Sequence, residues 1–452
     1  MLHLFDTASG QVTPIELRRP GHLSMYVCGP TVSGEPHLGH GRFTLTWDVL
    51  RRYLTWSGVE VRFVSNITDI EDKIIARAAA EGTTTELVAS KYEKVWWDSM
   101  DRLGVWSPTE GPHATAYVPQ MVELIAGLVD GGHAYVGGDG VYFASESVPD
   151  YGLLARQPLS SLRAGARIEA TEESGKRSPI DFVLWKLAKP GEPSWPSPWG
   201  AGRPGWHTEC VVMSLDLLGD GFDLHGGGND LAFPHHENER AQAEAIGRPF
   251  ARHWVHSGMV EAEGGGKMSK SLGNVMSLPE LLDANDPRVM RLQVLQSHYR
   301  SPMTISPSTL AAATNTLRGL DTFASDFAAA RSAEPDAALL GRLRERMDDD
   351  LDTPAAVRLL FEARDRARTA SLPGGCGDAD RWAATVFEMA DVFGLPLGRD
   401  DEAVPADIQA IADERSVARA ARDWARSDAL RVRLAADGWI VEDGPSGTTL
   451  HR

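Results

Sequence analysis

Four side chains of the types that bind soft divalent metals are spread along the sequence: Cys28, Cys210, His235 and Glu239. His235 and Glu239 follow Pro234, which favours the first turn of a helix, so we expect both on one helical face. Singly, each has an ordinary alternative, since a cysteine is most often a small buried hydrophobe and such a His/Glu pair a surface pair. Together they suit zinc, and a weakly held carboxylate can leave a position open for a substrate thiol.

A second group of residues is of the kind that binds phosphate. His37, Gly39 and His40 lie in the string PHLGH, before a predicted helix whose amino end would attract phosphate. Lys267 and Lys270 follow three consecutive glycines far along the chain, and their ammonium groups can stabilise a departing pyrophosphate. Each string alone is weak, because charged glycine-rich loops are usually solvated surface. Found in this order on one chain, the two strings predict an ATP site.

The elements around the first motif form a β-α-β pattern. Residues 23–28 predict a strand, 29–41 a Gly- and Pro-containing loop, 44–56 a helix and 59–64 a second strand. Such a unit implies a parallel sheet with a right-handed crossover, and ligands of such sheets bind beyond the carboxyl ends of the strands. Cys28 and the loop after it therefore lie where chemistry is expected.

The rest of the chain changes character twice. Residues from about 115 to 200 mix short strand patterns, such as HAYVGGDGVYFA, with Gly/Pro-rich loops, which predicts a segment inserted between two halves of the sheet domain. From Ser308 onward the pattern is that of Ala/Leu/Arg-rich amphipathic helices, and 373–377 and 398–405 are expected linkers. Cys376 lies in the first of these and has no expected role.

The composition places bounds on the kind of protein. An apolar fraction of 42% with 24% charged residues is ordinary for a globular protein, and 452 residues suffice for two to four domains. Three distant cysteines argue against a disulfide framework, and we expect a cytoplasmic protein because neither a targeting signal nor a membrane-spanning stretch is visible. The net charge of −18 disfavours broad nucleic-acid binding but allows a local basic face.

These motifs resemble those of class I aminoacyl-tRNA synthetases, whose signatures are HIGH and KMSKS, and within that class the cysteinyl-tRNA synthetase family. Leucine replaces isoleucine in the first signature, a nearly volume-conserving change. The resemblance extends to DDDLDTPAA (348–356) and RAARDWARSDALR (419–431). The other matching stretches are MYVCGPTV (25–32), NITDIEDKI (66–74), GWHTEC (205–210), FDLHGGGNDLAFPHHENE (222–239) and KMSKSLGN (267–274).

The resemblance implies roles for individual residues. Zinc would be held by Cys28, Cys210, His235 and Glu239, with His207, His225 and His236 along the floor of the site. The substrate cysteine would contact Gly29, Thr68 and Trp206, although Trp206 has core packing and Thr68 a strand-end cap as alternatives. Catalysis would rest on His37, His40, Lys267 and Lys270, and the ATP contacts would be His37, Gly39, His40, Gly227, Asn229, Asp230, Lys267 and Lys270.

The implied fold is α/β, a Rossmann-like parallel-sheet catalytic domain with an inserted α+β segment, followed by a helical-bundle tRNA-binding region. The chain has a short tail after Asp400, so the anticodon-reading part is expected to be reduced. The expected boundaries are 1–115 and 201–255 for the catalytic domain, 116–200 for the insertion, 256–307 for the KMSKS loop and stem-contact region, 308–400 for a DALR-like helical domain and 401–452 for a small C-terminal tRNA/anticodon-contact region.

The resemblance implies a monomeric, membrane-free ligase with one zinc ion, which activates L-cysteine with Mg·ATP and transfers it to tRNA(Cys). Two alternatives remain: a cysteine ligase that delivers cysteine to an amino sugar, and a catalytically idle relative of the synthetases. Glu239 and the retained tail favour the tRNA enzyme over the first, and the intact motifs disfavour the second. Arginines at helical spacing suggest a basic face for RNA, with plain solvated surface as the alternative: Arg415, Arg419, Arg422, Arg426 and Arg431.

Overall fold

The computed structural model describes residues 1–156, 175–261, 276–373, 377–398, 405–421, 423–437, 439–444 and 447–451. The chain divides into two compact units, residues 1–397 and 398–452, and each is considered by itself. Within the described ranges, no helix has both the length and the apolar character needed to cross a membrane. The predicted segment Lys267–Ser271, Cys376 and most of the two expected linkers lie outside these ranges.

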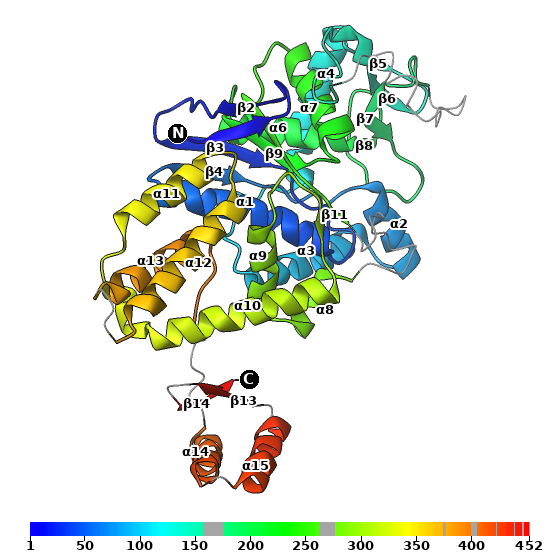
Figure 1. Cartoon of the computed structure of the whole chain (residues 1–452). Coiled ribbons are helices and arrows are strands. Elements are labelled where there is room, and N and C mark those ends of the chain that lie inside the picture. The colour runs from blue at the N-terminus through cyan, green and yellow to red at the C-terminus, as the bar shows by residue number, and fades with distance from the viewer. Residues whose placement is uncertain are drawn as a thin grey trace. The chain divides into compact units, whose positions relative to one another are not determined.

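The centre of the first unit is a parallel sheet of four strands in the order β10-β9-β3-β4 (Figure 1). Strands β3 (His22–Val27) and β4 (Glu60–Val64) confirm the two predicted strands to within one residue at each end. Strands β9 (Leu224–Gly228) and β10 (His253–Ser257) come from the other half of the chain and are buried along their whole length. Helices cover both faces of the sheet, so the polar side chains of these two strands, such as His225 and His256, are buried and must find partners inside the protein.

The alternation of side chains along β3 decides which helix each residue meets. Met25 and Val27 lie in the cluster formed with α1 (Leu38–Trp56), whereas Tyr26 and Cys28 lie in the cluster formed with α6 (Trp206–Leu218). Side chains point to opposite faces of a strand at alternate positions, so Cys28 points to the α6 face. Figure 1 shows α1 and α6 on opposite sides of the sheet.

Helix α1 begins at Leu38, six residues before the predicted start, so the expected loop 29–41 ends at His37. The backbone N–H of His37 donates to Nδ1 of His40 at 3.0 Å, which satisfies one of the donors left open at the helix start. Two glycines, Gly39 and Gly41, lie in the first turns of this helix, and Gly41 packs tightly against Met290. A Cβ there would lie 2.6 Å from the methyl carbon of Met290.

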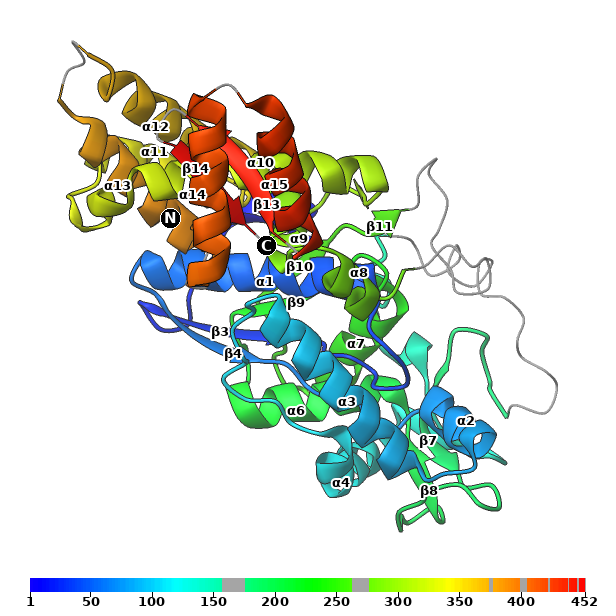
Figure 2. The ribbon, with the colours of Figure 1, turned by 90° about the horizontal axis from the view of Figure 1, so that it is seen from below.

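The segment after β4 contains two helices and then an antiparallel sheet. Helices α2 (Asp72–Glu81) and α3 (Thr85–Arg102) lead to α4 (Val118–Asp130), and Figure 2 shows α3 beside α1. The antiparallel sheet has the order β5-β6-β7-β8, and its first two strands fall in the predicted strand pattern HAYVGGDGVYFA. Its strands are β5 (Ala134–Val136), β6 (Gly140–Phe143), β7 (Phe182–Leu187) and β8 (Gly202–Pro204).

Helices follow the sheet domain, as the amphipathic pattern after Ser308 predicts. They share one hydrophobic core with α1 and the central sheet, and the buried pair Asp48–Arg291, 2.5 Å apart, joins α1 to α9. The helices are α8 (Leu278–Ala284), α9 (Pro287–Gln296), α10 (Pro307–Asp326), α11 (Ala337–Asp348), α12 (Thr353–Ala370) and α13 (Ala379–Val392). The remaining elements are α7 (Glu237–Ala245), the antiparallel pair β1 (His3–Asp6) and β2 (Gln11–Pro14), and the parallel pair β11 (Val260–Glu261) and β12 (Met303–Thr304).

The second unit contains α14 (Ala406–Ala420), α15 (Trp424–Ala436) and the antiparallel pair β13 (Ile440–Gly444) and β14 (Gly447–His451). The expected basic face is wrong at Arg415, because this side chain is only 2% exposed. Ile408, Ile411 and Arg415 follow one another at spacings of three and four, so all three lie on the face of α14 that packs into the small core. Arg422 lies outside the described residues, whereas Arg426 is exposed.

Candidate active site

The four predicted metal ligands come together from four different elements. Cys28 directly follows β3, Cys210 lies in α6, His235 in the short helical stretch Ala232–His236 and Glu239 in α7. The Sγ atom of Cys28 lies 3.6 Å from Sγ of Cys210 and 3.5 Å from Oε1 of Glu239. Nε2 of His235 lies 3.7 Å from Sγ of Cys210 and 2.9 Å from Oε1 of Glu239. The expectation that His235 and Glu239 share one face is confirmed.

This donor set fits a metal ion of the size and softness of zinc. Tetrahedral zinc, with bonds of about 2.0 to 2.3 Å, holds its donor atoms about 3.3 to 3.8 Å apart. Three of the four separations above fall in that range, and the shorter His235–Glu239 contact is a hydrogen-bonded ion pair. All four ligand atoms lie within 4.8 Å of one another, and all four side chains are buried.

The ionisable groups of this cluster strongly change one another's pKa values. Burial opposes charge on Glu239, but the contacts with His235 and His225 outweigh it and hold the pKa of Glu239 well below its usual range. Burial likewise opposes charge on His235, but Glu239 raises the pKa of His235 to about 10. Burial raises the pKa of the Cys28 thiol, whereas the hydrogen bond from Cys28 and the contact with His235 lower the pKa of Cys210 to about 6 despite burial. Glu239 and Cys210 therefore carry negative charge where a cation would bind.

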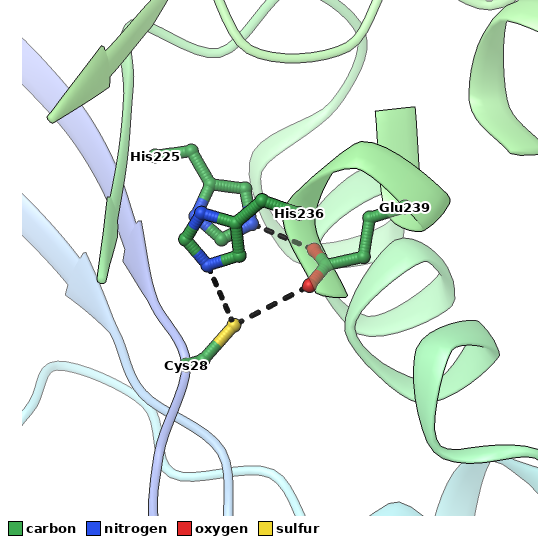
Figure 3. A group of neighbouring side chains, drawn as sticks. All are labelled: Cys28, His225, His236 and Glu239. Atoms are coloured by element: carbon green, nitrogen blue, oxygen red, sulfur yellow. Dashed lines mark hydrogen bonds and ion pairs between the residues drawn. The ribbon is translucent and has the colours of Figure 1, made fainter. Parts of the chain in front are cut away.

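A second group of four ligand-type residues overlaps the first. Cys28 and Glu239 belong to both groups, and His225 and His236 complete the second (Figure 3). Nε2 of His225 lies 2.7 Å from Oε2 of Glu239, and Nε2 of His236 lies 3.4 Å from Sγ of Cys28. Both histidines are fully buried, and burial lowers the pKa of His236 well below its ordinary value. Both histidines therefore lie next to the predicted ligands, and their place on the floor of a substrate site stays a prediction.

Sequence reasoning missed His256, which supports this floor. Its Nε2 lies 2.9 Å from Nδ1 of His236, and its Nδ1 lies 2.6 Å from the Thr7 hydroxyl. Such contacts to the second ring nitrogen fix the orientation of an imidazole beside a metal centre. The signal was available, since His256 stands in the string HWVHS at the end of a buried strand, next to the strand that carries His225.

Sequence reasoning also missed Asn66, a buried residue beside the predicted metal ligands that forms several hydrogen bonds. Its Oδ1 accepts from the Tyr26 hydroxyl at 3.1 Å and from the Gly29 N–H at 2.9 Å, and its Nδ2 donates to Thr68 Oγ1 at 3.1 Å. The Thr68 hydroxyl in turn donates to Glu209, 3.1 Å away. The side chain of Asn66 thus holds Gly29 and Thr68, the two residues expected to meet the substrate. Its position in NITD, just after β4, was the available signal.

Two further features shape the entrance to the site. Trp206 is 37% exposed, and its ring stacks on the His235 imidazole with the centroids 3.9 Å apart and the planes at 17°. It is therefore not plain core. Gly29 lies close to the backbone of Asn66: a Cβ at position 29 would lie 1.6 Å from the carbonyl oxygen of Asn66. A side chain at position 29 would push the two strand ends apart.

The predicted phosphate-binding histidines lie at the amino end of α1. His37 precedes the first helical residue, and its ring stacks on that of His40 with the centroids 3.8 Å apart. The Asn229 N–H donates to the Ser257 carbonyl at 2.9 Å, so the turn after β9 is held against the end of β10. Gly227 lies in β9, next to its last residue, and Asp230 lies in the turn that follows. Lys267 and Lys270 lie outside the described residues, so their role stays a prediction.

Comparisons with known proteins agree with this architecture. Residues 14–315 match the family model of the class I (C) tRNA synthetase catalytic domain, and residues 342–398 match that of the DALR domain. Among solved structures, Mycobacterium tuberculosis methionyl-tRNA synthetase in complex with methionyl-adenylate superimposes with a TM-score of 0.60 at 17% identity, covering 82% of this chain and 89% of that one. The fold and the catalytic-domain match define a class I aminoacyl-tRNA synthetase.

The curated relatives specify the family within this class. A cysteine–tRNA ligase of Alkalilimnicola ehrlichii is 44% identical over the full length of both chains, and one of Brevibacillus brevis is 40% identical over 100% of this chain and 99% of its own. A third, from Beutenbergia cavernae, is 44% identical over 99% of this chain and 98% of its own. The chain belongs to the cysteine–tRNA ligase family.

Proposed function

We propose that this chain, acting as a cytoplasmic monomer, activates L-cysteine with Mg·ATP and transfers it to the 3′ end of tRNA(Cys), using one zinc ion at the Cys28 cluster. One observation carries the proposal: two thiols, an imidazole and a carboxylate converge at the carboxyl end of β3, the strand that precedes the α1 helix in the chain. When bound there, zinc supplies a direct bond to the thiolate of the amino acid, which the hydroxyl of serine does not match.

Activation joins the amino acid to the α-phosphate. The cysteine carboxylate attacks the α-phosphorus of ATP, the bond from that phosphorus to the bridging oxygen breaks, and pyrophosphate leaves with its magnesium. His37 and His40 would donate to the phosphate oxygens that gain charge, and Lys267 and Lys270 would offset the charge of the departing pyrophosphate. Gly227, Asn229 and Asp230 would hold the adenosine end. Catalysis is then positioning and electrostatics, without covalent attack by the protein.

Transfer releases AMP and moves the cysteinyl group to RNA. The 2′-hydroxyl of the terminal adenosine attacks the carbonyl carbon of cysteinyl-adenylate, and the bond to the phosphate oxygen breaks. The chain's own residues hold the amino acid for this step, with Gly29 and Thr68 fixed by Asn66 and with Trp206 beside His235. We propose that the expected segments 256–307 and 308–400, together with the tail 401–452, contact the tRNA.

Metal analysis paired with pyrophosphate exchange tests the activation half. The wild type should contain about one zinc per chain, and exchange should depend on cysteine with a preference over serine of about 10⁴ to 10⁵, the range for a site built around a group that the competitor lacks. Cys28→Ser should lower metal content and raise the KM for cysteine together. Unchanged exchange in a zinc-free Cys28→Ser variant would refute the role of the metal.

The acceptor needs a separate test, because the cysteine ligase of mycothiol synthesis also adenylates cysteine. Charging of tRNA(Cys) is compared with ligation to glucosaminyl-inositol in parallel reactions, and cysteinyl-tRNA is the expected product. The match of residues 342–398 to the DALR domain supports the tRNA acceptor. If zinc is bound but cysteine-dependent exchange is absent, the chain is an idle relative, and the catalytic proposal fails.

A further inference from the structure

Arg42 is a charged side chain that the fold buries almost completely, two residues after His40 on α1. It is 1% exposed, although a guanidinium removed from water must recover its hydrogen bonds inside the protein. Burial lowers the pKa of Arg42 to about 10 against the opposing effect of Glu261, so the side chain is a cation at neutral pH. Its partners are the backbone carbonyl oxygens of Met259 (2.6 Å), Tyr299 (3.3 Å), His298 (3.4 Å) and Ser301.

These carbonyls belong to two chain segments that meet at Arg42. The Gly258 N–H donates to the Tyr299 carbonyl at 2.7 Å, and the Met303 N–H donates to the Met259 carbonyl at 3.0 Å. The same segments continue as the parallel pair β11 and β12. Arg42 therefore completes a junction in which two backbone carbonyls each accept both an amide and a guanidinium N–H. Removing the guanidinium would leave four backbone carbonyls of this junction without this donor.

The first of these segments adjoins the proposed adenosine end of the ATP site. It begins where β10 ends at Ser257, whose carbonyl accepts from the Asn229 N–H at 2.9 Å. The sulfur of Met259 lies 3.8 Å from the place that a Cβ on Gly228 would take. The segment that Arg42 binds thus adjoins the end of β9 and, through Ser257, the turn that follows it. On its other side, Arg42 lies in the first two turns of α1 together with His40, and His37 immediately precedes this helix.

We propose that Arg42 is a positioning residue for ATP, which fixes the distance between the phosphate-binding end of α1 and the adenosine-binding turn after β9. This inference rests on the proposed function, in which ATP spans these two places. Lysine is a poor substitute, because a compact ammonium group cannot reach carbonyls of both segments with the planar fork of donors that arginine offers. Misplacement of about 1 Å in such a site costs up to about 100-fold in rate.

Arg291 provides a matched control. It is also 1% exposed and also binds α1, through Asp48 at 2.5 Å, and it donates to the carbonyls of Leu103 (2.9 Å), Gly104 (3.0 Å) and Phe393 (3.2 Å). Its junction joins α1 to α9 and to the ends of α3 and α13, and within the described residues its hydrogen bonds reach none of the residues proposed to bind ATP. Loss of either arginine should lower stability, but only loss of Arg42 should raise the KM for ATP.

The experiment compares Arg42→Met, Arg42→Lys and Arg291→Met in the full-length, metal-loaded protein. Cysteine-dependent pyrophosphate exchange is measured with ATP and cysteine varied separately, together with zinc content and the apparent Tm. Arg42→Met should raise the KM for ATP about tenfold or more and lower kcat, with the KM for cysteine within about twofold of wild type and zinc content unchanged. Arg42→Lys should fall between Arg42→Met and wild type. Arg291→Met should lower the Tm and leave the KM for ATP within about twofold.

Two outcomes would overturn the inference: an unchanged KM for ATP in Arg42→Met with a Tm loss like that of Arg291→Met, or parallel rises of the KM values for ATP and cysteine. If Arg42→Met does not fold, a wild-type KM for ATP in Arg42→Lys overturns it equally. Equilibrium binding of α,β-methylene-ATP to the same variants decides the point without turnover. Absence of exchange in the wild type would therefore count against the proposed function alone. The affinity of each variant for α,β-methylene-ATP relative to wild type would still decide the role of Arg42.

Discussion

The Sγ atoms of Cys28 and Cys210 lie 3.6 Å apart, although 182 positions separate the two residues in the chain. A disulfide requires about 2.05 Å, so the pair is a thiol hydrogen-bonded to a sulfur and not an oxidised bridge. The fold lowers the pKa of Cys210 to about 6 and raises that of Cys28. The cluster therefore offers one preformed thiolate and one thiol that a metal must deprotonate.

Zinc binding to the metal-free protein should release about two protons at pH 7.5, one from Cys28 and one from His235, because a metal binds only the deprotonated ligand. The raised pKa values of these two groups keep both protonated without metal, whereas Cys210 is already ionised. Metal affinity should consequently fall as the pH is lowered. Calorimetric titration in buffers of different ionisation enthalpy measures the number of protons. Release of no protons would mean that neither group binds the ion.

Cobalt substitution should distinguish the two overlapping groups of ligands. Cobalt bound by Cys28, Cys210, His235 and Glu239 has two thiolate ligands, whereas the group with His225 and His236 has one. Cys210→Ser should therefore remove about half of the sulfur-to-cobalt charge-transfer absorption and weaken binding, and His236→Gln should leave that absorption intact. A full two-thiolate spectrum in Cys210→Ser, or its loss in His236→Gln, would place the ion elsewhere.

Replacement of Asn66 by alanine should raise the KM for cysteine several-fold more than the KM for ATP. The variant leaves the buried Tyr26 hydroxyl and Gly29 N–H without their acceptor, a penalty of about 1 to 3 kcal/mol in stability. Asp181→Ala is the control, because Asp181 also accepts from a buried tyrosine hydroxyl and a backbone N–H but lies in the β5–β8 region. Both variants should lower the Tm. Equal KM values for cysteine in the two would argue that Asn66 is merely structural.

Loss of Asp350 should destabilise the first unit. Its Oδ1 accepts from the Phe5 N–H at 2.9 Å and the Tyr299 hydroxyl at 2.8 Å, and its Oδ2 accepts from Nε of Arg300 at 2.8 Å. Asp350→Ala leaves these donors unpaired, so thermal unfolding should show a loss of about 2 to 4 kcal/mol. Asp350→Asn keeps one acceptor and tolerates the positive φ of 55°, so it should recover part of that loss. Equal Tm values for alanine and wild type would contradict this reading.

The local pattern of the sequence determined several features correctly. The run from Leu23 to Cys28 and the later run ending at Val64 predicted parallel strands, because side-chain alternation and flanking glycines act over a few residues. The identity of the four ligand-type residues was also readable, since donor chemistry belongs to the residue and the i, i+4 spacing of His235 and Glu239 fixes their common face. The start of α1 was wrong by six residues because tight packing of Gly41 against Met290 overrides the weak helical preference of glycine.

Other features depend on contacts between distant parts of the chain, which no local pattern encodes. The burial of Arg415 follows from the packing of α14 and not from its charge. Only the tertiary structure decides that β9 inserts beside β3, which brings His225 beside Glu239, and that α6 packs on β3, which brings the two thiols into contact. The sequence by itself determined which side chains can bind metal and phosphate, whereas the packed sheet and its helices decided their distances, their burial and therefore their charge. The physical reason is that donor chemistry is a property of one residue, but desolvation and electrostatic coupling are properties of its neighbours in space.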